Sequence, residues 1–312
     1  MTAPAIRTTN LSHNFGSLRA LDDISFEVQR GTIFGFLGPN GAGKTTTIHL
    51  LLGLLQPRSG QIEVLGFNPL THASRIREQC GALLEHNGLY ERLSAYENLD
   101  YYARIWHLPT RARRARIQEL LESLQLWDRR KETTSTWSRG MKQKLALART
   151  LLHRPALVFL DEPTAGLDPL ATVSVREDLQ NLANSQGVTI FLTTHNLTEA
   201  EKICRQIAVI RRGRLLATGS PDEVRQSGGK ASLEISGDGF DETMLAALHT
   251  QPGIESIQAT GTNLRIIFNR PVSSAPLINL LVGLGAQIEE VRKGKNDFED
   301  AFLSLLEEEP TA

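Results

Sequence analysis

A glycine-rich segment near the N-terminus has the composition of a phosphate-binding loop. Residues 38–46, GPNGAGKTT, fit the pattern G-x-x-x-x-G-K-[ST]. The glycines let the backbone turn so that successive N–H groups face an anion, and a helix that starts here adds its dipole. The charge of Lys44 suits the β- and γ-phosphates, and the Thr45 hydroxyl suits Mg²⁺. We therefore expect nucleotide binding by Gly38, Pro39, Asn40, Gly41, Ala42, Gly43, Lys44, Thr45 and Thr46.

Two adjacent acids follow an apolar run in the second half of the chain. Residues 157–163, LVFLDEP, predict a buried strand that delivers Asp161 at its C-terminal end, where open α/β sheets bind their ligands. Asp161 can hold Mg²⁺ through water, and Glu162 can reach a water molecule in line with a γ-phosphate. Alone, two acids would suit a solvated strand end. After a phosphate-binding loop, they indicate a metal site at Asp161 and a catalytic role for Glu162.

The elements that must position these residues follow from the spacing of apolar residues. Short continuous apolar runs predict buried strands, and a 3.6-residue period predicts helices. The expected strands are 21–28, 32–38, 59–66, 157–163 and 188–195, and residues 206–219 read as a hairpin that turns at Gly213. The expected helices are 45–54, 95–108, 111–126, 141–152, 172–187 and 196–205.

The character of the sequence changes near residue 228, after the last of these elements. Gly228 and Gly229 have the character of a linker, so we expect a first domain over residues 1–227 and a second over residues 228–312. The second part predicts strands and helices in the order βαββαβ and then a last helix, which is the order of a ferredoxin-like module. The expected elements are 231–237, 241–250, 254–260, 263–269, 275–285, 286–292 and 297–309.

The composition is that of a globular protein with a sizeable core. Of 312 residues, 40% are apolar and 22% are charged, and the net charge of −1 favours neither nucleic acid nor anionic lipid. Cys80 and Cys204 form no CxxC motif, so no disulfide or metal scaffold is expected. No run approaches the roughly 18 apolar residues that span a bilayer, and the N-terminus lacks a signal-peptide core. We expect a cytosolic protein whose membrane role comes through a partner.

The ordered motifs resemble those of the nucleotide-binding subunit of ABC transporters, over residues 5 to about 220. Residues 137–141, WSRGM, stand where that family has its Leu-Ser-Gly-Gly-Gln signature, and residues 165–169, AGLDP, resemble its D-loop. His195 resembles the switch histidine that senses the γ-phosphate. Phe15 resembles the aromatic residue that stacks on adenine.

This resemblance implies a fold, an activity and a partner. The implied fold class is α/β: an ABC ATPase domain with a mixed sheet core, an antiparallel β subdomain and a helical subdomain at about 85–150, then a small α+β ferredoxin-like domain. Two subunits, identical or paralogous, pair head to tail, and each ATP lies between the P-loop of one and the signature of the other. The implied cofactors are ATP and Mg²⁺. The implied catalytic residues are Lys44, Glu162 and His195, and further residues expected at the nucleotide are Phe15, Glu85, Ser138, Gly140 and Asp168.

The chain departs from the family pattern at the signature and at the Q-loop. Arg139 replaces the first signature glycine, and Met141 replaces the glutamine. An arginine can add a contact to phosphate or to the interface, but it needs room that a glycine does not. Glu85 stands at the position of the Q-loop glutamine. A carboxylate there can coordinate Mg²⁺ or position water, yet it adds negative charge near phosphate.

The segment after Glu85 is the expected contact with membrane subunits. We expect a helix that opens with residues 88–99, GLYERLSAYENL. In the family that the chain resembles, this region receives the coupling helices of the membrane subunit. Leu89 and Tyr90 are the candidate contact residues, and ordinary packing within the helical subdomain is the alternative.

The signature helix and the C-terminal part favour one branch of the family. Residues 138–155 and the tail after residue 228 resemble the drug-, lipid- and polysaccharide-export ATPases of the daunorubicin-resistance type. We therefore expect an exporter ATPase at the cytoplasmic face of the membrane, with no nucleic-acid partner. One alternative is a soluble ABC protein acting on ribosomes or DNA, although such proteins usually carry two ATPase domains, zinc sites, coiled coils or basic insertions. A kinase or GTPase would leave residues 137–141 and His195 without a role.

Overall fold

A six-stranded sheet, in the order β5-β6-β7-β3-β8-β9, carries the candidate site in a computed structural model that describes residues 3–228, 232–269, 272–294 and 298–307. Strands β3, β6 and β7 pair in parallel, so their C-terminal ends share one edge of the sheet. Strand β9 adds an antiparallel edge through the hairpin at Gly213, so the predicted mixed sheet is confirmed. The bounds are Ile33–Leu37 for β3, Cys80–Leu83 for β5, Leu157–Asp161 for β6, Thr189–Thr194 for β7, Gln206–Arg211 for β8 and Arg214–Gly219 for β9.

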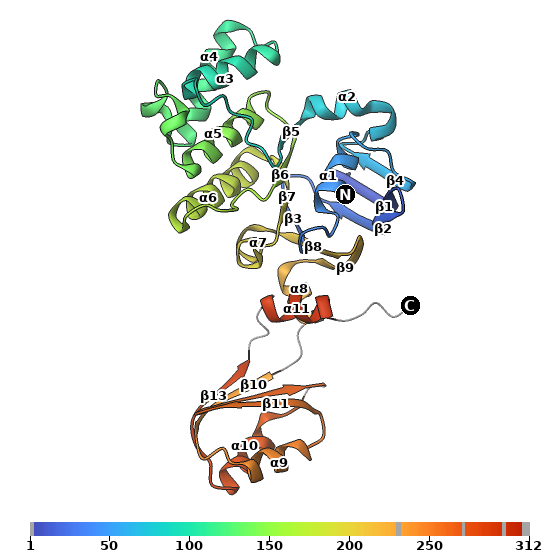
Figure 1. The fold of residues 1–312 in the computed structure, drawn as a ribbon, viewed down its shortest axis with the longest axis vertical. Helices are drawn as coiled ribbons and strands as arrows, with labels where there is room; N and C mark the ends of the chain where they lie inside the picture. The colour runs from blue at the N-terminus through green and yellow to red at the C-terminus, as the bar shows by residue number, and fades with distance from the viewer. Residues whose placement is uncertain (1–2, 229–231, 270–271, 295–297, 308–312) are drawn as a thin grey trace. The chain divides into compact units, whose positions relative to one another are not determined.

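An antiparallel sheet packs beside the first one and shares its core (Figure 1). Its strand order is β2-β1-β4, with β1 at Ile6–Phe15, β2 at Leu18–Val28 and β4 at Ser59–Val64. In β2, Ile24, Phe26 and Val28 are buried, and the residues between them are exposed. This alternation is the one that the sequence predicts for a strand with one face on a core.

Aromatic rings fill the core that the two sheets share. The Phe191 ring lies 5.5 Å from the rings of Phe34 and Phe36 and 5.7 Å from the ring of Phe159, measured between centroids. The Phe26 ring, from the antiparallel sheet, lies 6.2 Å away. These contacts tie strands β2, β3, β6 and β7 together. Strands β3, β6 and β7 are the ones whose C-terminal ends lead into the candidate site.

Helices α3, α4 and α5 form a separate group at the opposite side of this unit from the antiparallel sheet (Figure 1). The helix α3 begins after Ser94, where Ser94 and Glu97 satisfy each other's backbone N–H groups in a capping box. The helix α6 ends at Gly187 in the left-handed conformation, as the sequence predicts. The bounds are Lys44–Leu51 for α1, Pro69–Gln79 for α2, Ala95–Ile105 for α3, Thr110–Ser123 for α4, Arg139–Leu151 for α5, Pro169–Gln186 for α6 and Leu197–Ile203 for α7.

The prediction that a helix opens at residue 88 is wrong. Residues 84–94 form turns and extended chain, and α3 starts only at Ala95. The buried side chain of Asn98 holds this loop, because it accepts a hydrogen bond from the Tyr90 N–H group and donates to the carbonyl oxygens of Tyr90 and Leu93. The sequence also did not indicate α2 or the short strand β5.

The chain divides into two compact units, Met1–Pro221 and Asp222–Ala312, which we describe separately. The predicted boundary between residues 227 and 228 falls within the last turn of α8, Pro221–Gly228, and Gly229 lies outside the described residues. That boundary therefore stays a prediction.

The second unit has the predicted order βαββαβ followed by a helix. Its sheet is antiparallel in the order β11-β12-β10-β13, and α9 and α10 cover one face of it around a core of leucine, isoleucine and phenylalanine side chains (Figure 1). This order agrees with a ferredoxin-like module. The bounds are Ser232–Asp238 for β10, Glu242–His249 for α9, Ile254–Thr260 for β11, Asn263–Phe268 for β12, Ser274–Gly283 for α10, Gln287–Gly294 for β13 and Phe298–Glu307 for α11.

Both cysteines are buried, free thiols. Burial raises the pKa of Cys80 to about 12 and also raises the pKa of Cys204. In the described part of the chain, no helix combines the length and apolar character needed to cross a bilayer.

We expect Phe191→Ala to destabilise the first unit by about 3–5 kcal/mol, because the truncation leaves a cavity among packed rings. Phe191 is fully buried, at 0% exposure. Urea unfolding followed by tryptophan fluorescence checks this, since Trp106, Trp127 and Trp137 all lie in the first unit. The matched control is Leu54→Ala at an exposed position, which should shift stability by no more than about 0.5 kcal/mol. Equal effects of the two substitutions would contradict this account of the core.

Candidate functional site

The glycine-rich loop connects β3 to α1 at the shared sheet edge. Gly38 passes so close to β8 that a Cβ there would lie 2.2 Å from the Ile210 carbonyl oxygen. Gly43 has φ 108°, which favours glycine, and it precedes α1 without any side-chain cap. The first N–H groups of α1 are therefore free of a capping side chain and suited to an anion.

Lys44 is folded back into this loop. Its side chain is 7% exposed, and its Nζ donates to the carbonyl oxygens of Gly38 at 2.7 Å and Pro39 at 3.3 Å. The same Nζ lies 3.5 Å from Oε1 of Glu162. A buried cation is thus held beside the loop by partners that a phosphate oxygen could replace.

Asp161 lies between two threonine hydroxyls. Thr45 Oγ1 donates to Asp161 Oδ2 at 2.9 Å, and Thr193 Oγ1 donates to the other carboxylate oxygen. A carboxylate beside a hydroxyl at a phosphate loop is a donor set that fits Mg²⁺. The sequence did not single out Thr193, although the parallel register places it directly opposite Asp161.

Glu162 contacts both a cation and a histidine. His195 Nδ1 and Glu162 Oε1 form a hydrogen bond of 2.9 Å, in addition to the contact with Lys44. Glu162 has φ 51°, a left-handed conformation that costs a residue other than glycine about 1–2 kcal/mol. The hydrogen bond from its N–H group to the Thr193 carbonyl oxygen, 3.0 Å, holds this turn at the end of β6. The three residues predicted to act in catalysis therefore meet at one point, and their roles stay predictions.

Two pockets open from these residues. The larger one, about 820 Å³, runs from the exposed ring of Phe15 along the loop to the acids at the sheet edge. Its volume suits a drug-sized or nucleotide-sized ligand. Arg19 and Arg212 also line it, and no motif in the sequence indicated them.

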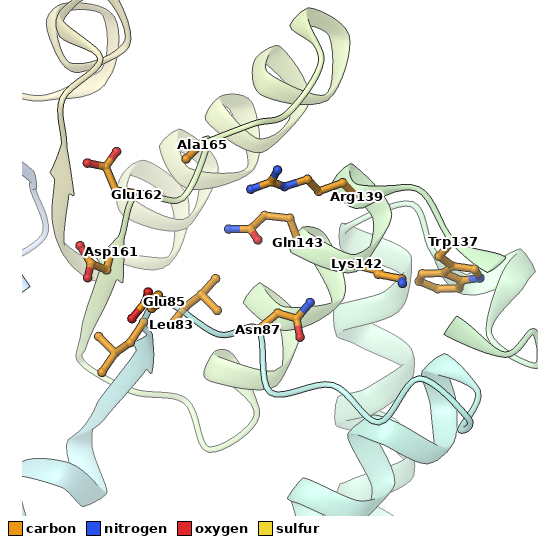
Figure 2. Close-up of a pocket in the computed structure, with 11 residues that line it drawn as sticks. Leu83, Glu85, Asn87, Trp137, Arg139, Lys142, Gln143, Asp161, Glu162 and Ala165 are labelled. Carbon is orange, nitrogen blue, oxygen red and sulfur yellow. The ribbon is translucent and has the colours of Figure 1, made fainter. Parts of the chain in front are cut away.

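The smaller pocket, about 490 Å³, lies between the acids and the start of α5 (Figure 2). Glu85, Asp161 and Glu162 line both pockets, so the structure brings Glu85 to the two acids, while its predicted contact with the nucleotide stays a prediction. Across from them, Arg139, Lys142 and Gln143 project from α5 (Figure 2). The pocket therefore has an acidic wall and a basic wall.

The basic wall is tied to the loop that follows Glu162. Gln143 Nε2 donates to the Pro163 carbonyl oxygen at 2.7 Å, and the Arg139 guanidinium lies over Gly166. Lys142 forms an ion pair of 2.6 Å with Glu91, away from this loop. Gln143 is a positioning residue that the sequence did not reveal, because its partner lies on a different element.

Three of the residues predicted to contact the nucleotide also stabilise the first unit, through helix capping or close packing. The Ser138 and Asp168 side chains cap α5 and α6 by accepting from the N–H groups of Met141, at 3.2 Å, and Ala171, at 2.9 Å. Gly140 lies against the start of α6, where a Cβ would come 2.7 Å from the Cβ of Ala171. These roles are compatible with a nucleotide contact supplied to a second subunit.

Comparisons with known proteins agree with these observations. The model of the family described as "ABC transporter" matches residues 21–165. The chain is 35% identical to the daunorubicin resistance ATP-binding protein DrrA3 of Streptomyces coeruleorubidus over 303 residues, 97% of this chain and 93% of that protein. It is 37% identical to the Nod factor export ATP-binding protein I of Ralstonia nicotianae over 266 residues, 84% of this chain and 81% of that protein.

A solved structure resembles the first unit. The structure of cbiO1 from Clostridium perfringens, described as part of the ABC transporter complex cbiONQ, matches with a TM-score of 0.68 and 28% identity. The match covers 72% of this chain and 91% of that one. The predicted fold class is thereby confirmed.

We expect Gly140→Ala to destabilise the first unit by about 1–3 kcal/mol, because the added methyl group overlaps Ala171. Adding Ala171→Gly makes room, so the double variant should be more stable than the sum of the two single effects predicts. Thermal unfolding of the four proteins without nucleotide measures this. Strict additivity would show that positions 140 and 171 are not coupled and would contradict this packing role of Gly140.

Proposed function

The chain belongs to the family of ABC transporter ATP-binding proteins, and we propose that it is the ATP-hydrolysing subunit of an exporter that works with separate membrane subunits. The observation that carries this proposal is the convergence of Lys44, Asp161, Glu162 and His195 around the phosphate loop. The reaction is the hydrolysis of ATP to ADP and phosphate.

ATP would lie along the larger pocket. Phe15, 49% exposed, offers a ring face to the adenine, and the loop amides with the N-terminus of α1 face the phosphates. Lys44 would exchange its carbonyl partners for phosphate oxygens. Thr45 and Asp161 would hold Mg²⁺, which neutralises charge on the phosphates when it is bound.

Glu162 is the group that we assign to the attacking water. Its carboxylate lies beside Lys44, next to the expected γ-phosphate, and can orient the water or accept its proton. The hydrogen bond from His195 Nδ1 fixes the position of this carboxylate. The histidine side chain is 61% exposed, so its ring is also available to sense phosphate. Catalysis of this kind depends mainly on charges that are in place before the reaction.

A second subunit, identical or paralogous, would complete the site in a head-to-tail dimer. Ser138 and the first turn of α5 would meet the γ-phosphate bound to the partner, with Gly140 and Asp168 at the same interface. Exposed apolar side chains at the start of α6 support such an interface: Leu170 is 83% exposed and Val173 lies one turn further on. Loss of the γ-phosphate would release the two subunits.

The membrane subunits would dock beside Glu85, at the face of α3 and the loop before it. Tyr90, Tyr101 and Ile105 expose large side chains there, and the Tyr90 and Tyr101 rings pack 5.0 Å apart. Leu89 is only half-buried in the same loop. This docking would place the protein at the cytoplasmic face of the membrane.

We expect Glu162→Gln to bind ATP and to dimerise with it, while ATP hydrolysis falls by about 100-fold or more. The amide keeps the shape of the side chain but cannot accept a proton. Phosphate release and size-exclusion chromatography with ATP measure the two effects. Brisk turnover by this variant would refute the assignment of Glu162, and absence of an ATP-dependent dimer would refute the shared site.

We expect Glu85→Ala to lower ATP hydrolysis more than it lowers nucleotide binding, because Glu85 lies with Asp161 and Glu162 at the acidic wall and is not itself part of the phosphate loop. Glu85→Gln is the matched variant, since it removes the charge and keeps the length. Turnover assays and nucleotide titration of both proteins provide the comparison. Equal losses of binding and turnover would contradict this role.

A further inference from the structure

Arg212 is an exposed arginine beside the phosphate loop, in the turn between β8 and β9. The next residue, Gly213, holds this turn in place, because its N–H group donates to the Ala42 carbonyl oxygen at 3.0 Å and its carbonyl oxygen accepts from the Asp22 N–H group at 2.8 Å. Gly213 packs so closely on β2 that a Cβ there would lie 2.6 Å from the Ala20 carbonyl oxygen. The backbone of Arg212 is therefore fixed at the wall of the larger pocket, which this residue helps to line.

The order of the strands puts Arg212 and the acids of the sheet edge on opposite sides of the phosphate loop. Strand β3 ends in this loop, and β7 and β6, which lead to His195 and the acids, lie on one side of β3. Strand β8, which leads to Arg212, lies on the other side. The loop contacts the acids through Lys44 and Thr45. A nucleotide with its γ-phosphate near the acids and its adenine on Phe15 would therefore carry its ribose and α-phosphate past Arg212.

The side chains around Arg212 carry an excess of positive charge. Arg19 and Arg214 both form ion pairs with the carboxylate of Asp22, at 3.0 Å and 2.7 Å. Among the residues that the structure describes, no carboxylate lies within ion-pair distance of Arg212. The guanidinium of Arg212 is thus the cation of this group that can bind an incoming anion without breaking an existing ion pair.

We propose that Arg212 binds the α-phosphate of the nucleotide. The inference rests on the proposed binding of ATP along the larger pocket and adds a contact on the nucleoside side of the loop. A guanidinium presents several N–H donors in one plane, which matches phosphate oxygens. The α-phosphate is the same in ATP and ADP, and its charge does not change when the γ-phosphate leaves. The contact should therefore strengthen the binding of both nucleotides equally and leave the chemical step unchanged.

The test compares ADP affinity, by titration calorimetry, with KM and kcat for ATP hydrolysis in the full chain. Arg212→Ala should weaken ADP binding by about tenfold and raise KM by a similar factor, with kcat little changed, because one charge-assisted contact is lost. Arg212→Lys should lie between Arg212→Ala and the unaltered chain. Arg214→Ala is the matched control: it removes the same charge from the same hairpin, and Asp22 keeps Arg19 as its partner. It should bind ADP as the unaltered chain does, and thermal unfolding without nucleotide checks that every variant is folded.

Titration with 2′,3′-dideoxy-ADP separates a phosphate contact from a ribose contact. Arg212→Ala should lose the same factor with this nucleotide as with ADP, and a loss seen with ADP alone would place the contact on the ribose and overturn the proposal. Unchanged ADP binding by folded Arg212→Ala, or an equal loss in Arg214→Ala, would also overturn it and leave the proposed function standing. If the unaltered chain neither binds ADP nor hydrolyses ATP, the proposed function itself fails.

Discussion

The parallel register of β3, β6 and β7 is the constraint on which the candidate site depends. Leu37 lies opposite Thr194, and Asp161 lies opposite Thr193, so segments that are far apart in the sequence end at one edge of the sheet. The phosphate loop, the acids and the histidine all follow these strand ends. Backbone pairing and the phenylalanine core beneath it therefore place the charges before any ligand arrives. This pre-organisation is the condition under which fixed charges lower a reaction barrier most.

In the free protein, the charged groups at this edge are held by partners from the chain itself, and a nucleotide can take the place of those partners. Lys44 is nearly buried, and an unpartnered buried cation would be costly, so two loop carbonyl oxygens and Glu162 hold it. Phosphate oxygens offer stronger partners to the same Nζ. Binding would then release Glu162 from Lys44 toward water while His195 keeps its hydrogen bond to the carboxylate. The same groups thus stabilise the free protein and are available for the reaction.

The sequence predicts the residues whose chemistry is coded locally and misses those that depend on packing between elements. Lys44 and Thr45 follow from loop spacing, and Asp161 with Glu162 follows from an apolar strand. Thr193 and Gln143 act only because another element brings Asp161 or Pro163 to them, and no local pattern carries that information. The sequence predicts a helix from residue 88, but residues 88–94 form a loop because the buried side chain of Asn98 binds the backbone of Tyr90, a contact that no local pattern shows. For most of the other helices and strands of both units, the apolar pattern extends over the whole element, and the sequence predicts them correctly.

The two departures from the family pattern oppose each other electrostatically. Replacement of the Q-loop glutamine by Glu85 adds a negative charge, and replacement of the signature glycine by Arg139 adds a positive one, on opposite walls of the same pocket. The pocket of one subunit therefore gains no net formal charge from the two replacements, but the added charges are separated across it. An anion in this pocket is attracted toward the wall formed by α5 and repelled from the wall that carries Glu85, Asp161 and Glu162, because Coulomb interactions depend on distance as well as on net charge.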